Sequence, residues 1–85
     1  MVIFIYNMFY TYVLESKSDH KLYIGHTNNL KRRLKQHLGK KVPATKDRFP
    51  LKLVYYEACL NIDKAVQREH YFKTGFGRLF LNNRI

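Results

Sequence analysis

The 85-residue sequence predicts a single α+β domain, in which a small three-stranded antiparallel sheet is flanked by helices in the order β-β-α-β-α. Two runs of aromatic and β-branched residues surround a polar turn near the start, which predicts a hairpin. Two later segments repeat their apolar residues at helical spacing, and a third strand-like run lies between them. The composition, 46% hydrophobic and 15% aromatic, favours a folded core over disorder, and the length allows only one core.

The hairpin is expected to pair residues 9–15 with residues 21–25 across the turn SKSDH. With the loop centred between Lys17 and Ser18, Tyr12 lies directly opposite Tyr23. A centre shifted by one residue makes the two tyrosines diagonal neighbours on the same face. Either register places two phenols side by side, although aromatic cross-strand pairs often have a purely structural role.

The first helix is expected to begin after Thr27 or Asn28 as its N-cap. Its apolar stripe recurs every four residues, at Leu30, Leu34 and Leu38. Arg33 and His37 lie along the border of this stripe as an i, i+4 pair that leans toward the protein. An arginine in that position either extends outward to solvent or is held against negative charge in a cleft.

Positive charge dominates this helix and the Gly- and Pro-containing loop 39–50 that follows it. The formal net charge is +10, and residues 31–52 contain nine of the sixteen Lys and Arg but only one acid, Asp47. Such an imbalance indicates a polyanionic partner, and we expect DNA phosphates to be bound with little base readout. The residues expected to bind nucleic acid are Lys31, Arg32, Lys35, Lys40, Lys41, Lys46 and Arg48.

A membrane partner is not expected. The longest apolar run has about 14 residues, whereas a membrane span needs about 20. This run lacks the features of a signal peptide, so the chain is expected to be cytoplasmic. Cys59 is the only cysteine, which excludes an internal disulfide, and no Cys/His spacing indicates zinc.

The third strand is expected over residues 51–59 as a well-buried strand, with Cys59 as a small core residue. A second helix follows over residues 63–73, and residues 74–85 are expected to close the core as a turn or short helix. The side chains expected to pack from these two segments are Ile62, Ala65, Val66, Phe72, Phe76, Leu79, Phe80 and Ile85.

Glu69 falls in the middle of the second helix's apolar face. A carboxylate there costs several kcal/mol unless it is paired or binds a metal. One interpretation is a salt bridge to Lys73 at i+4. The other, which the basic surroundings favour, is a functional carboxylate.

The remaining residue types restrict the chemistry. The six acids form no close pair in sequence, which argues against a two-metal site, and there is no phosphate-binding glycine loop and no nucleophile elbow. A tyrosine pair, an arginine, a histidine and an isolated glutamate suit phosphodiester hydrolysis with one divalent ion, Mg²⁺ or Mn²⁺. Tyr12 or Tyr23 is favoured as the base or water-orienting group with His37 positioning it, and His37 itself is the competing candidate.

Six sequence blocks in order resemble the GIY-YIG nuclease superfamily, in particular its small stand-alone bacterial proteins. The blocks are YTY (10–12), YIG (23–25), LxRRLxxH ending at His37, TKxRxP (45–50), LVYYE (53–57) and REHYFK (68–73). The resemblance covers residues 9–85 and leaves residues 1–7 as an extension, with Met8 as an alternative start.

The resemblance implies catalytic roles for Tyr12, Tyr23, Arg33, His37 and Glu69, with Glu69 as the metal ligand. Three features depart from the family's pattern. The first motif reads YTY rather than GIY, and His26 stands where repair-type members often place a lysine. An asparagine used by several relatives would be Asn82, Asn83 or neither.

The function expected from these observations is a metal-dependent DNA endonuclease whose specificity comes from DNA structure, a partner protein or a homo-oligomer. Two alternatives stay open. One is a non-catalytic nucleic-acid-binding module, and the other is a basic RNA-associated or structural protein.

Overall fold

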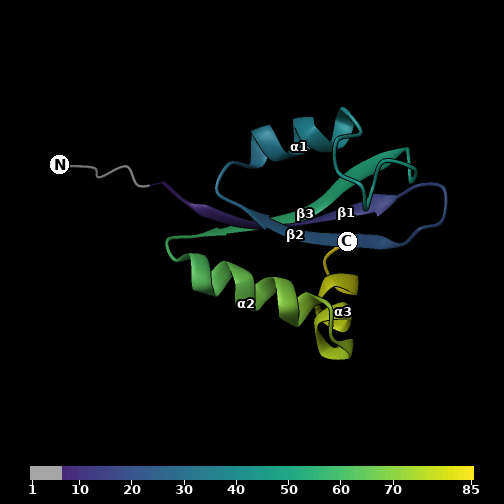
Figure 1. Cartoon of the computed structure of the whole chain (residues 1–85). Coiled ribbons are helices and arrows are strands. Elements are labelled where there is room, and N and C mark those ends of the chain that lie inside the picture. Colours follow the sequence, from purple (N-terminus) through teal and green to yellow (C-terminus); the bar gives the residue numbers. More distant parts are fainter. Residues whose placement is uncertain (1–6) are drawn as a thin grey trace.

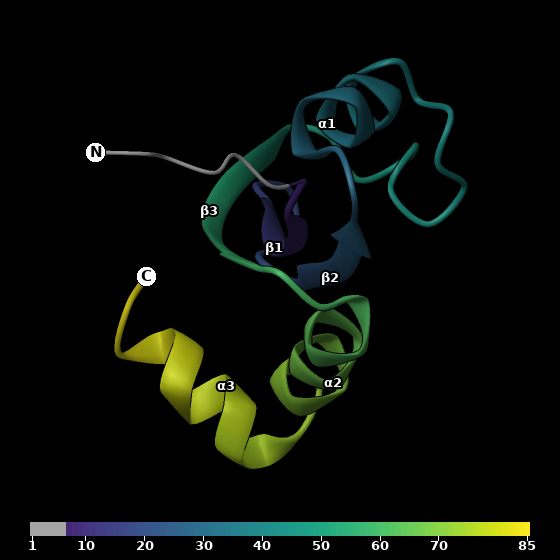
Figure 2. The ribbon, with the colours of Figure 1, turned by 90° about the vertical axis from the view of Figure 1, so that its left-hand side faces the viewer.

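The computed structural model describes residues 7–85, and it confirms the α+β class (Figure 1). The strands and helices are β1 (Phe9–Ser16), β2 (Leu22–Thr27), α1 (Leu30–Leu38), β3 (Leu51–Cys59), α2 (Ile62–Phe72) and α3 (Gly75–Asn82). The three strands form one antiparallel sheet in the order β2-β1-β3, so β1 is central. Helix α1 covers one face of the sheet, and α2 and α3 lie on the other face (Figures 1 and 2).

The hairpin adopts the shifted register, in which the centre of the loop lies between Ser18 and Asp19. Tyr12 pairs with Gly25 and Leu14 pairs with Tyr23, so the two tyrosines are diagonal neighbours and the directly opposite pairing was wrong. The turn explains the difference. His20 takes a left-handed conformation with φ 59°, and the Ser16 amide donates to the Lys21 carbonyl, which closes a four-residue loop over residues 17–20.

The apolar core lies between the sheet and the pair α2 and α3. Val13, Ile24, Phe72 and Leu81 are its buried members. Helix α3 docks closely because Gly77 has no side chain, since a Cβ there would lie 1.9 Å from the Tyr71 carbonyl oxygen. Of the two forms expected for this segment, a turn or a short helix, the structure shows the helix, Gly75–Asn82.

The side chains that α3 contributes to the core differ from those expected. Leu81 is buried and Phe80 packs partly against the core, whereas Phe76, Leu79 and Ile85 are exposed. The expectation was wrong for these three because the close approach at Gly77 fixes the face that α3 turns inward.

Strand β3 is an edge strand and not a well-buried one. Each of its residues is half-buried or exposed, and Cys59 is half-buried. The expectation of a buried strand failed because β1, with both neighbours present, occupies the centre of the sheet. Helix α2 begins one residue earlier than expected and leaves Ile62 largely exposed.

Helix α1 turns a different edge toward the sheet than its leucine stripe predicts. Its N-cap is Asn29, whose side chain accepts from the Arg32 amide, and not Thr27 or Asn28. Leu38 is 66% exposed, while His37 is 1% exposed. The helix therefore turns its Arg33 and His37 edge toward the sheet, and these residues form the candidate active site.

Candidate active site

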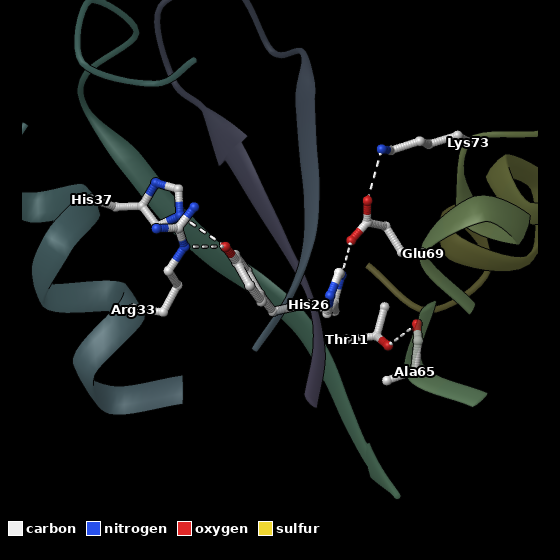
Figure 3. Close-up of polar contacts among 8 residues, drawn as sticks. Thr11, His26, Arg33, His37, Ala65, Glu69 and Lys73 are labelled. Atoms are coloured by element: carbon white, nitrogen blue, oxygen red, sulfur yellow. Dashed lines mark hydrogen bonds and ion pairs between the residues drawn. The ribbon is translucent and has the colours of Figure 1, made fainter. Parts of the chain in front are cut away.

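A buried polar network joins β1 to α1 (Figure 3). The Tyr12 side chain is fully buried, and its hydroxyl lies 2.9 Å from Nε2 of His37. Nε of Arg33 donates to the same hydroxyl at 3.3 Å. On the far side of the imidazole, Nδ1 of His37 lies 2.7 Å from Oγ1 of the buried Thr45. Three segments far apart in sequence are thus held together by one chain of hydrogen bonds.

Gly25 makes room for this network. It is the cross-strand partner of Tyr12, and a Cβ at residue 25 would lie 2.7 Å from the Tyr12 hydroxyl oxygen and 2.8 Å from its Cζ. These distances are shorter than a carbon atom tolerates. The glycine of the YIG motif therefore provides the surface on which the Tyr12 ring lies.

The environment fixes the protonation states of the network. Burial raises the pKa of Tyr12 to about 12, although the hydrogen bond from Arg33 opposes the increase. Burial, together with the charge of Arg33, lowers the pKa of His37 to about 4. At neutral pH the phenol is therefore protonated and the imidazole is neutral. A neutral imidazole donates from one nitrogen and accepts at the other, which suits Tyr12 and Thr45 as its two partners.

Tyr23 lies beside this network on the same face of the sheet. Its ring centroid is 6.2 Å from that of Tyr12 and 5.1 Å from that of His37. Unlike Tyr12, it is only half-buried. Of the two phenols, Tyr23 is the one that a ligand can reach.

Glu69 projects from α2 toward the opposite face of the sheet. Its Oε1 lies 2.6 Å from Nδ1 of His26, and its Oε2 accepts from Nζ of Lys73 at 2.9 Å (Figure 3). Thr11, the strand partner of His26, fixes α2 here by donating to the Ala65 carbonyl at 2.8 Å. The salt bridge expected as one interpretation of Glu69 is therefore present.

The carboxylate of Glu69 is charged at neutral pH. Partial burial alone would raise its pKa, but the hydrogen bonds with His26 and Lys73 outweigh burial and lower it. Within residues 7–85, no hydrogen bond connects this group to the Tyr12 network. The structure brings Tyr12, Tyr23, Arg33 and His37 together on one face and places Glu69 on the other, with the edge strand β2 between them.

The donor chemistry at Glu69 fits a divalent ion that is held mainly by substrate. Across the part of the chain that the structure describes, no group of three or more His, Cys, Asp and Glu side chains could hold a metal. Mg²⁺ often binds through one or two carboxylates, retained waters and substrate phosphates rather than through a full protein cage. Glu69 would supply such a carboxylate, and the nitrogen of His26 lies next to it.

The cations expected to bind nucleic acid fall into two groups. Lys31, Arg32 and Lys35 are exposed and line a shallow cavity of about 290 Å³ with Asn29. In the loop after α1, Lys41 and Lys46 are exposed, whereas Arg48 forms an ion pair with Asp19 at 3.7 Å and Lys40 lies over the Phe49 ring. The outer face of α1 is thus the most available cationic surface.

Sequence reasoning missed two partners of the site. Thr45 belongs to the TKxRxP block but received no role, and it is buried against His37. His26 was noted only as a departure from the family's pattern, and it contacts Glu69. Asn82 lines a cavity with Glu15 and Lys17 at the hairpin end of the sheet, and neither Asn82 nor Asn83 makes a side-chain hydrogen bond to the five site residues within residues 7–85.

The model of the GIY-YIG catalytic domain matches residues 8–83 of this chain. The chain belongs to the GIY-YIG family. A UPF0213 protein of Bacillus licheniformis is 46% identical over 68 residues, which cover 79% of this chain and 69% of that protein. A UPF0213 protein of Clostridium perfringens is 46% identical over 67 residues, covering 78% and 71%.

A solved structure supports the GIY-YIG assignment of the fold. The solution NMR structure of a UPF0213 protein from Bacillus halodurans matches with a TM-score of 0.57 at 32% identity, covering 89% of this chain and 83% of that one. Membership of the GIY-YIG family suggests a phosphodiesterase that acts on nucleic acid. Among residues 7–85, no helix has the length and apolarity that a membrane span requires.

Proposed function

We propose that this GIY-YIG domain is a metal-dependent DNA endonuclease that hydrolyses phosphodiester bonds with a single Mg²⁺ or Mn²⁺ ion. The observation that supports this most strongly is the arrangement around β2. On one face of the sheet, Tyr23 projects from β2 beside His37, and Arg33 binds the Tyr12 hydroxyl of the neighbouring strand; on the other face, Glu69 contacts His26 of β2. The proposal places the scissile phosphate at the open edge of β2, between these two faces.

In this proposal the two tyrosines have different roles. Tyr12 is a positioning residue, since it is fully buried and its raised pKa of about 12 opposes ionisation. Its hydroxyl holds Arg33, whose guanidinium balances the negative charge that develops on phosphate. His37 is buried and neutral, so it orients Tyr12 rather than acting as the base. Tyr23 is then the phenol that orients the attacking water or accepts its proton.

Glu69 would hold the divalent ion, with His26 beside it. A bound divalent ion would supply Lewis-acid stabilisation of the charge on phosphate. In the absence of the ion, Lys73 forms an ion pair with the carboxylate and His26 forms a hydrogen bond with it, and these contacts keep it ordered at the edge of the site.

The test is a cleavage assay on supercoiled, branched and single-stranded DNA with Mg²⁺ or Mn²⁺. Tyr23→Phe should lower the rate by about 10²–10⁴, the usual contribution of a general base. Tyr71→Phe, a half-buried tyrosine of α2, is the matched control and should retain the rate. A Tyr23→Phe rate within about tenfold of wild type would contradict the role of Tyr23.

A second candidate is a nucleic-acid-binding module without catalytic activity. The contacts of Glu69 with His26 and Lys73 favour it, because they give this carboxylate a structural role that needs no metal. Salt-sensitive DNA binding without cleavage of any of the three substrates, with either ion, would support this candidate and overturn the endonuclease.

A further inference from the structure

A groove lies on the α1 face of the sheet, beside the candidate active site. It has a volume of about 610 Å³, within the range of sites that bind small molecules. The lining residues that matter for its chemistry are Tyr10, Asn28, Asn29, Lys31, Leu34 and Tyr56. It combines an apolar floor with aromatic rings, side-chain amides and one cation.

Two tyrosines form the aromatic part of the groove. The ring centroids of Tyr10 and Tyr56 are 6.3 Å apart, and the rings are inclined at 54°. Tyr56 is 52% exposed although it lies in a β-strand, so its side chain is accessible to a ligand. A tilted aromatic pair with an accessible ring is a surface on which a planar ring can stack.

The other lining residues indicate which planar ring would bind. Asn28 and Asn29 line the groove, and since the Oδ1 atom of each accepts from Arg32, their amide N–H groups are the donors that a ligand would meet. Lys31 lines both this groove and the cationic cavity formed with Arg32 and Lys35. A nucleobase in the groove would therefore leave its phosphates next to the cations of α1.

The groove lies next to the candidate active site along the strands. Tyr56 is the cross-strand partner of Tyr12, and Tyr10 lies two residues from Tyr12 on the same face of β1, about 7 Å along the strand. A strand bound at the site could thus place a neighbouring base in the groove.

We propose that this groove, lined by Tyr10 and Tyr56, is a binding site for an unpaired nucleobase of a single-stranded nucleic acid. The proposal deepens and rests on the proposed function, because it adds a base-binding subsite to a phosphodiesterase. A base within a duplex is stacked on its neighbours, so duplex DNA cannot use the groove in this way. Stacking on an aromatic side chain tolerates any base, and the groove should therefore show little sequence preference.

The test measures binding in EDTA, so that cleavage plays no part. Fluorescence anisotropy compares a labelled single-stranded oligonucleotide with the matching duplex, using the full chain. Tyr56→Ala should weaken single-strand binding about 5- to 100-fold and change duplex binding less than twofold. Tyr56→Phe keeps the ring and should bind as the wild type does.

Phe76→Ala is the matched control, since this ring is 79% exposed on α3, on the other face of the sheet. It should leave both affinities unchanged. A Tyr10→Ala variant provides the second test of the groove, and thermal melting establishes that each variant is folded.

Several results would overturn the proposal. Unchanged single-strand binding in folded Tyr56→Ala and Tyr10→Ala would do so, as would an equal loss of single-strand and duplex binding. AMP that binds the groove while the oligonucleotide does not compete would assign it to free nucleotides instead. If Tyr56→Ala raised the fraction of monomer and left the affinity for single strands unchanged, the groove would instead be the binding site for a second copy of the chain.

Failure of the groove is distinguishable from failure of the proposed function. Wild-type protein that binds single strands through Tyr56 but cuts no DNA keeps the groove and refutes the endonuclease. Wild-type protein that cuts DNA while Tyr56→Ala binds single strands normally refutes only the groove.

Discussion

Replacement of Gly25 by alanine tests the packing on which the candidate active site depends. The added Cβ would lie 2.7 Å and 2.8 Å from the hydroxyl oxygen and Cζ of Tyr12. The Tyr12 ring cannot move away easily, because it is fully buried and its hydroxyl is held by Arg33 and His37. We therefore expect the alanine to displace the ring and break these hydrogen bonds.

Overpacking of this kind costs about 1–3 kcal/mol of the free energy of unfolding. For a domain of this size, each kcal/mol lowers the melting temperature by about 4–8 °C. Thermal unfolding followed by circular dichroism should thus show a decrease of about 4 °C at least. Cleavage should fall as well, because Arg33 loses the contact that positions it.

Gly75→Ala is the matched control. A Cβ at this residue has no atom within 4 Å, and Gly75 is the first residue of α3. The same chemical change should be neutral there, or stabilising by about 0.4–1 kcal/mol through reduced freedom of the unfolded chain. If Gly25→Ala matched Gly75→Ala in stability and kept wild-type activity, the contact between Tyr12 and Gly25 would not be the one that orders the site.

Three further predictions concern charge. Glu69→Gln should abolish metal-dependent cleavage and keep DNA binding. Calorimetry should show that the free energy of unfolding falls by only about 0–1 kcal/mol, because the side chains of His26 and Lys73 remain exposed to solvent. An unstable variant that still cuts DNA would show that Glu69 has a structural role. The free energy of unfolding should fall by about 3 kcal/mol between pH 6.5 and pH 4, because the unfolded chain protonates His37 near 6.5 while the folded chain resists until about 4. Denaturant titrations of wild type and His37→Gln should show that the variant loses less stability over this range, and equal slopes would contradict the buried neutral imidazole. DNA affinity should fall steeply between about 50 and 200 mM salt. The double variant Lys31→Ala, Lys35→Ala should reduce the slope of log K against log salt by about 1–2. An unchanged slope would mean that the DNA phosphates do not contact these two lysines.

The sequence alone determined the order of the elements and the main candidates for the site. Local signals set these features: the turn between two β-rich runs, the helical spacing around Leu34, and the position of Glu69 on the apolar face of its helix. The i, i+4 relation of Arg33 and His37 follows from helix geometry alone, so it could be predicted without the fold. Likewise, a hairpin with two tyrosines on one face required only the alternation of a strand.

Tertiary packing decided how those elements meet. A helical wheel gives angles between residues but not which edge faces the sheet, and α1 turned His37 inward and Leu38 outward because Tyr12 and Thr45 offered hydrogen bonds there. Sequence spacing also could not tell which phenol is buried, since Tyr12 lies on the central strand and Tyr23 on an edge. The pairing of His26 with Glu69 joins residues 43 positions apart, and only the docking of α2 against β1 brings them within hydrogen-bond distance.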